Sequence, residues 1–197
     1  MYRCTRRDYC QMGDFQMLTC NASELSVVKI TSLQPGDLFA YAGSGGSFIA
    51  VAVENDERQY FSWMRLTGDH PFFMEDLGQG SLAYAQGHKV LNLALRWDQL
   101  QVQVDPTSIS RAADIPTGGL VVGQDAQIVT AFRNSSDDDI QERFGVSLRN
   151  LERQPMSASS AYACTSWRMV YVASGLPPEV IAEFSRTRTA TVETLRI

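Results

Sequence analysis

This 197-residue chain has no long apolar run, no C-x-x-C cysteine pair and only two histidines. Its longest apolar run, Phe48–Val53, is far shorter than the roughly 20 residues that span a bilayer, and no signal-peptide core follows the start. The four cysteines form no C-x-x-C pair, and the two histidines are too few for a metal-dependent barrel enzyme. We therefore expect a cytoplasmic, non-catalytic protein without a membrane segment, metal or cofactor.

The chain also lacks an excess of positive charge. Its net charge of −5 excludes a surface that is basic throughout. The distribution of charge is uneven. Residues 1–136 carry ten basic and fourteen acidic groups, whereas residues 140–197 carry seven Arg and five Glu, and the acidic run Asp137–Asp139 separates them. The mildly basic C-terminal part can meet phosphates through local arginines, but it is not a strong nucleic-acid footprint.

Strand patterns dominate residues 25–136, while residues 1–24 lack periodicity and are expected to form an N-terminal arm. In Leu100–Val104, apolar residues alternate strictly with glutamines, which is typical of a half-buried strand. Further strands are expected at Phe48–Val53, Tyr60–Leu66 and Val90–Leu95, with turn residues between them. Short strands at such spacing predict a β-sandwich or small barrel.

After residue 136 the pattern favours helices. Four segments carry it: Ile140–Phe144, Leu148–Arg153, Ala161–Ser174 and Pro178–Phe184. The expected fold class is therefore α+β, with a β-rich barrel or sandwich at 25–136 followed by a short all-helical region at 137–197.

The segment Ile140–Arg153 carries the sharpest functional signal. Apolar residues stand four apart before Gly145-Val146-Ser147 and three apart after it, which predicts two short helices joined by a tight turn. Ser147 would cap the second helix, and Arg149, Asn150 and Arg153 would form its polar side. Such a helix reads base edges in a DNA major groove. The alternative is an ordinary helical hairpin whose arginines are merely solvated.

The wording ERFGVSLRNLER within this segment resembles the first helix-turn-helix of AraC-family bacterial transcription regulators. The resemblance extends loosely over 137–189, through Trp167–Met169 and through Ile181–Glu183 and Phe184–Arg186, which abut where the family's second motif has a turn. It implies a cupin-like N-terminal domain for effector binding or dimerisation, with Tyr60–Thr107 similar to it in outline. A rival alignment of Gly175–Glu193 resembles the LuxR-type motif.

Two hypotheses follow from these patterns. The first is an AraC-type regulator that binds double-stranded DNA through Ser147, Arg149, Asn150 and Arg153, has an incomplete second motif, and forms a homodimer through its β domain. The second is a non-catalytic β-domain protein that binds a small molecule or a protein partner, with its C-terminal helices packed on the barrel.

An effector pocket is a weaker expectation. Tyr60, Trp63 and Trp97 are the aromatic residues predicted to line it, although aromatic side chains in a β domain also serve as ordinary core packing.

Overall fold

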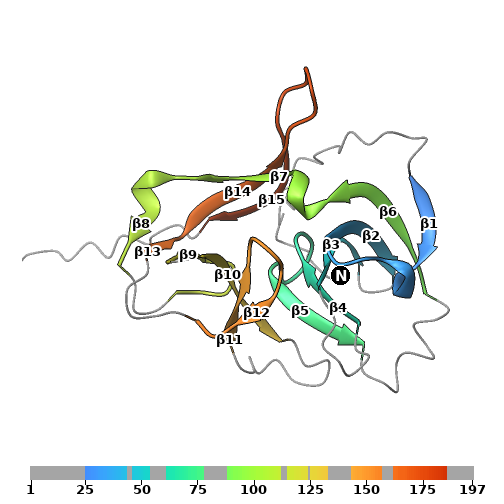
Figure 1. Cartoon of the computed structure of the whole chain (residues 1–197), viewed down its shortest axis with the longest axis horizontal. Coiled ribbons are helices and arrows are strands. Elements are labelled where there is room, and N and C mark those ends of the chain that lie inside the picture. Colours follow the sequence, from blue (N-terminus) through green and yellow to red (C-terminus); the bar gives the residue numbers. More distant parts are fainter. Residues whose placement is uncertain are drawn as a thin grey trace, which may run out of the picture.

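The structure is a computed structural model that describes residues 25–43, 46–53, 61–77, 88–111, 115–123, 125–132, 143–156 and 162–185. The described strands form two sheets, one of 12 strands and one of three (Figure 1). In chain order the strands are β1 (Ser26–Lys29), β2 (Asp37–Gly43), β3 (Gly46–Val53), β4 (Phe61–Arg65), β5 (Phe73–Leu77), β6 (Lys89–Arg96), β7 (Leu100–Val104), β8 (Ile109–Ser110), β9 (Leu120–Val122), β10 (Ala126–Phe132), β11 (Arg143–Ser147), β12 (Arg153–Gln154), β13 (Tyr162–Cys164), β14 (Ser166–Tyr171) and β15 (Glu179–Ser185).

Helical structure within the described ranges is limited to three short 3-10 turns: η1 (Ile30–Ser32), η2 (Trp97–Gln99) and η3 (Pro106–Ser108). The β-rich part of the expected fold class is confirmed, with strands at the four segments whose patterns predicted them. The all-helical C-terminal region is wrong. Strands β11 to β15 occupy the described residues beyond 142, and β11 and β14 pair with β10 and β7.

The large sheet has the strand order β1-β6-β2-β3-β4-β5-β10-β9-β13-β8, and β11 and β12 branch from β10. Neighbouring strands run antiparallel, except that β5 and β10 pair in parallel. The small sheet, β15-β14-β7, runs across the top of Figure 1. The main core includes Met64 and Met74 of the large sheet and Trp167 and Met169 of the small one. The two sheets therefore share one apolar interior.

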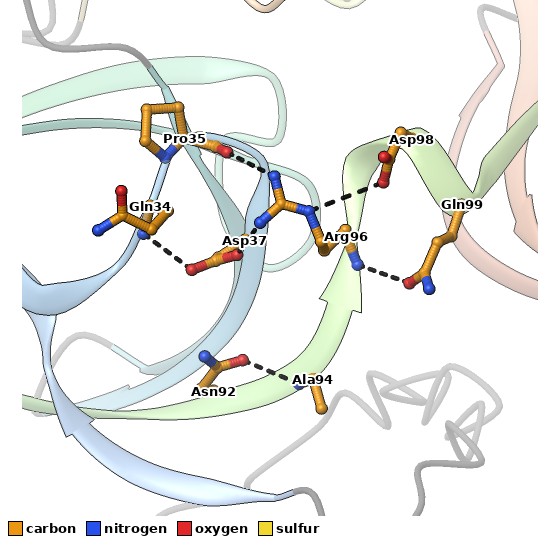
Figure 2. Close-up of polar contacts among 8 residues, drawn as sticks. All are labelled: Gln34, Pro35, Asp37, Asn92, Ala94, Arg96, Asp98 and Gln99. Carbon is orange, nitrogen blue, oxygen red and sulfur yellow. Dashed lines mark hydrogen bonds and ion pairs between the residues drawn. The ribbon is translucent and has the colours of Figure 1, made fainter.

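Arg96 fixes the corner at which the chain leaves β6 for β7 (Figure 2). Its guanidinium donates to Asp37 Oδ1 at 2.8 Å and to the Pro35 carbonyl at 3.2 Å. The side chain of Gln99 accepts from the Arg96 backbone N–H at 2.9 Å, which closes the η2 turn. This turn directs Trp97 inward, where it is 8% exposed.

The burial pattern of strand β14 shows why a helix was wrongly predicted for this segment. Trp167 and Met169 are buried, whereas Arg168 between them is exposed. This alternation has the period of a strand with one face on the core. The segment is also rich in aromatic and β-branched residues, which pack well on a sheet. The expected helix at Ala161–Ser174 is therefore wrong in its described part, as is the one at Pro178–Phe184, which is β15.

Candidate functional site

The predicted DNA-reading helix is instead the turn and second strand of a β-hairpin. β11 and β12 pair antiparallel, with Val146 opposite Arg153. Ser147 is buried, and its Oγ accepts a hydrogen bond from the Arg149 backbone N–H at 3.2 Å. The hydroxyl thus caps a tight turn and not a helix. Asn150 acts similarly, because its Oδ1 accepts from the Glu152 N–H at 3.3 Å. The helix-turn-helix prediction is wrong.

Arg153 is attached to the β structure. Its guanidinium carbon lies 4.3 Å from the ring centroid of Phe132 and 5.5 Å from that of Phe144. Its Nη2 also donates to Ser62 Oγ of β4 at 3.1 Å. A guanidinium over an aromatic face is held by a cation–π attraction. Arg153 therefore joins the hairpin to β10 and β4, whereas the sequence predicted a phosphate contact for it.

The three aromatic residues expected in an effector pocket have different positions. Tyr60 lies outside the described residues. Trp97 is a core residue, and its indole N–H donates to the Leu148 carbonyl at 2.7 Å, which holds the hairpin from a second side. Trp63 does line a pocket, on the opposite face of the large sheet from the main core.

Strand β3 explains how this outer face arises. In its sequence FIAVAV, Val51 and Val53 belong to the main core, whereas Phe48, Ala50 and Ala52 belong to a separate outer cluster. Every residue of the run is apolar because both faces of the strand are covered. The two alanines are fully buried. Their small side chains leave space between the larger residues of the neighbouring strands.

The register brings large side chains around these alanines. Tyr41 pairs with Phe48 across β2 and β3, and their ring centroids are 5.2 Å apart. Trp63 pairs with Glu75 across β4 and β5. The resulting pocket, which we call the outer pocket, has a volume of about 270 Å³. Its described lining residues are Ile30, Phe39, Tyr41, Phe48, Trp63, Arg65, Glu75 and His88.

One wall of the outer pocket carries an ion pair. Arg65 Nη2 lies 2.6 Å from Glu75 Oε1, and the two side chains are only 14% and 20% exposed. The Arg65 guanidinium carbon lies 4.2 Å from the centroid of the Phe48 ring. Nη1 donates to the Asp69 carbonyl at 3.3 Å. Arg65 Nε is buried and has no acceptor among the described residues.

The ion pair was not among the residues singled out from the sequence. Strand alternation alone places Trp63 and Arg65 on one face of β4, since they are two residues apart. That signal was available. The pairing of β4 with β5, which brings Glu75 to Arg65, depends on register and on the loop geometry between them, and residue types alone do not fix it.

Two other polar clusters lie in the small sheet and its corner. A hollow of about 300 Å³ is lined by Asp105, Arg168, Glu183 and their neighbours. Hydrogen bonds from the hydroxyl and then the backbone N–H of Thr107 lower the pKa of Asp105 from its ordinary value. Cys164 is buried with its Sγ 2.9 Å from Ser108 Oγ. The Asp105 bonds close the η3 turn, and the Ser108–Cys164 contact joins that turn to β13, so both have structural roles.

Within the described ranges, no cluster of three or more His, Cys, Asp or Glu side chains is arranged to hold a metal ion. The part of the chain that the structure describes also has no helix long and apolar enough to cross a membrane. Comparisons of the chain with protein-family models, curated proteins and solved structures find no match. The outer pocket is therefore the candidate site of this protein.

Proposed function

We propose that this chain is a β-domain protein that binds a small aromatic molecule in the outer pocket, without catalysing its conversion. The observation that carries the proposal is the pocket itself, which is walled by aromatic rings and contains one half-buried ion pair. Apolar and aromatic linings with a few placed polar groups are typical of small-molecule sites.

Binding without chemistry is the simpler function of this lining. The carboxylate among its described residues, that of Glu75, is already held by Arg65 at 2.6 Å. A general base has to reach the proton that it removes and carry it during the reaction. An arginine-bound carboxylate serves orientation and charge balance better than proton transfer.

The AraC-type regulator stays a prediction of the sequence resemblance. It required a reader helix, and the residues that would form one are the hairpin of β11 and β12. Arg153, the residue expected to hold a phosphate, stacks on Phe132 and donates to Ser62. No described contact favours DNA over a small molecule as the ligand, so we place small-molecule binding first.

The experiment is an NMR titration of the three tryptophan indole N–H signals. Trp63 lies in the outer pocket, whereas Trp97 and Trp167 donate to backbone carbonyls elsewhere and serve as internal references. Single Trp→Phe variants assign the signals. Toluene, phenol, indole and 2-pyridone are the probes. At least one of them should shift the Trp63 signal saturably and leave the other two in place.

A matched pair of variants locates the binding. Tyr41→Ala removes one aromatic wall, and loss of a ring contact worth about 1–3 kcal/mol should weaken binding roughly fivefold or more. Tyr162→Ala removes a ring that is 52% exposed on β13 and should leave binding unchanged. If no probe gives a saturable shift at millimolar concentration, or if both variants weaken binding equally, the proposal is wrong.

A further inference from the structure

The polar wall of the outer pocket offers a hydrogen-bond donor beside an acceptor. Glu75 stands opposite Trp63, so it is diagonal to Arg65, which lies two residues further along β4. The ion pair engages Nη2 of the arginine and Oε1 of the carboxylate. The two side chains remain 14% and 20% exposed. Each terminal nitrogen of a guanidinium carries two hydrogens and each carboxylate oxygen carries two lone pairs, so the pair keeps donor and acceptor capacity beyond its own bond. A ligand that offers an acceptor next to a donor can use this capacity.

The charge of the pair limits which ligands fit. Arg65 and Glu75 neutralise each other within the pocket wall. An anionic ligand would approach the glutamate, and a cationic ligand would approach the arginine, so each would meet a like charge. A neutral ligand that carries an N–H next to a carbonyl meets neither. Its N–H can donate to the carboxylate while its carbonyl accepts from the guanidinium.

The remaining walls set the shape of the ligand. Tyr41, Phe48 and Trp63 present aromatic surface, which favours a flat ring. The volume of about 270 Å³ lies just below the roughly 300–1,000 Å³ of sites for drug-sized molecules. One ring or two fused rings fit this size better than a larger scaffold does.

We infer that the outer pocket binds a neutral, planar heteroaromatic lactam, the chemical group present in uracil-like and guanine-like bases. The ring lies against the aromatic walls, and the lactam edge faces Arg65 and Glu75. This inference rests on the proposed function, because it specifies the ligand of the same pocket. Arg65 of β4 and Glu75 of β5 bind the lactam edge of the ligand, and the aromatic residues of β2, β3 and β4 contact the faces of its ring.

The test compares small probes of similar size on the unmodified chain. 2-Pyridone has the complete lactam edge, N-methyl-2-pyridone lacks the donor, and toluene lacks both groups. Benzoate and benzamidine carry opposite charges. Dissociation constants come from the indole N–H shift of Trp63. 2-Pyridone and uracil should bind at least tenfold more tightly than the other four probes, because each of those loses or mismatches a hydrogen bond at the buried pair.

A variant checks that the edge is read by the ion pair. Glu75→Gln replaces one carboxylate oxygen with an NH2 donor and should reduce the ratio between the dissociation constants of N-methyl-2-pyridone and 2-pyridone at least fivefold. Glu152→Gln, at an exposed turn of the hairpin, is the matched control and should preserve the preference. If Glu75→Gln does not fold, as judged by the signals of Trp97 and Trp167, Arg65→Lys replaces it, because lysine lacks the planar fork.

The outcomes distinguish a failure of the lactam inference from a failure of the proposed function. Equal binding of 2-pyridone, its N-methyl derivative and toluene would overturn the lactam inference and leave the aromatic-binding function standing. A preference for benzoate or benzamidine would also overturn it, because the wall would then select a charge. Failure of every probe to shift the Trp63 signal would overturn both the inference and the proposed function.

Discussion

Two regions of this molecule place an arginine over a phenylalanine ring, with opposite consequences. On the outer face of the large sheet, Arg65 lies 4.2 Å from the Phe48 centroid and pairs with Glu75 beside a hollow. At the hairpin, Arg153 lies 4.3 Å from the Phe132 centroid and donates to Ser62. The stacking is nearly the same, but the surroundings differ.

The difference comes from what fills the space next to each arginine. Ala50 stands opposite Arg65 in β3, so the outer face keeps room beside the guanidinium. Beside Arg153, Phe132 and Phe144 contact each other with centroids 5.0 Å apart, and Ser62 occupies the polar end. An arginine next to small residues can line a binding site, whereas one between aromatic rings fastens strands together. Arginine itself is therefore a poor indicator of nucleic-acid binding.

The largest expected effect comes from the other anchor of the hairpin. Trp97→Phe removes the indole N–H that donates to the Leu148 carbonyl. The carbonyl then loses its partner in a partly buried position, so the free energy of unfolding should fall by about 1–3 kcal/mol. Urea denaturation measures this change. Probe binding in the outer pocket should stay the same. A loss of binding with intact stability would contradict the structural role of the hairpin and its independence from the outer pocket.

Arg153→Ala should have the next largest effect. It removes the cation–π contact with Phe132 and the hydrogen bond to Ser62, so the free energy of unfolding should fall by about 1–2 kcal/mol. Arg149→Ala is the matched control. Arg149 is exposed in the turn, and its truncation should change stability by less than about 0.5 kcal/mol. Equal effects of the two variants in urea would contradict the anchoring role of Arg153.

Ser147→Ala tests the turn itself at a smaller scale. The buried hydroxyl accepts from the Arg149 N–H, and its loss should cost about 0.5–1.5 kcal/mol in urea denaturation. Asn150→Ala removes a longer bond, at 3.3 Å, in an exposed position and should cost less. The opposite ranking would mean that the turn depends on its exposed asparagine and not on its buried serine.

The hairpin also shows how far the sequence could be interpreted. Phe144, Val146 and Leu148 alternate with Arg143, Gly145 and Ser147, and this period of two describes β11 as well as the spacing of three and four described two helices. A short segment with five apolar residues can satisfy both periods. Ser147 was expected to cap a helix, but its Oγ accepts from the Arg149 N–H within a turn, because serine caps turns and helices by the same kind of bond.

In the first half of the chain, the positions of the strands were easier to predict than the pairing between strands. Glutamine alternation identified β7, and an unbroken apolar run identified β3. The candidate site required more than strands. Trp63 was expected in a pocket and lines one, but Arg65 and Glu75 meet only through the register of β4 and β5. Register depends on loops and long-range pairing, which local residue types do not specify.

The smallest expected effect on stability belongs to the Asp105 turn, which lies outside both arginine regions. Asp105 Oδ1 accepts from the Thr107 hydroxyl at 2.7 Å and from its backbone N–H at 2.9 Å, and these bonds hold the pKa of Asp105 below its ordinary value of 3.8. A carboxylate with a lowered folded-state pKa contributes stability that is complete above the unfolded-state pKa and is lost as the pH falls through the folded-state pKa. The stability advantage of the unmodified chain over Asp105→Asn should therefore be constant from neutral pH down to about pH 5 and should shrink below about pH 4.

Urea midpoints across this pH range measure the stability advantage. Thr107→Val, which removes the hydroxyl donor, should lose less stability in acid than the unmodified chain does. An advantage that stays constant through the acid range would show that these hydrogen bonds do not favour the charged carboxylate.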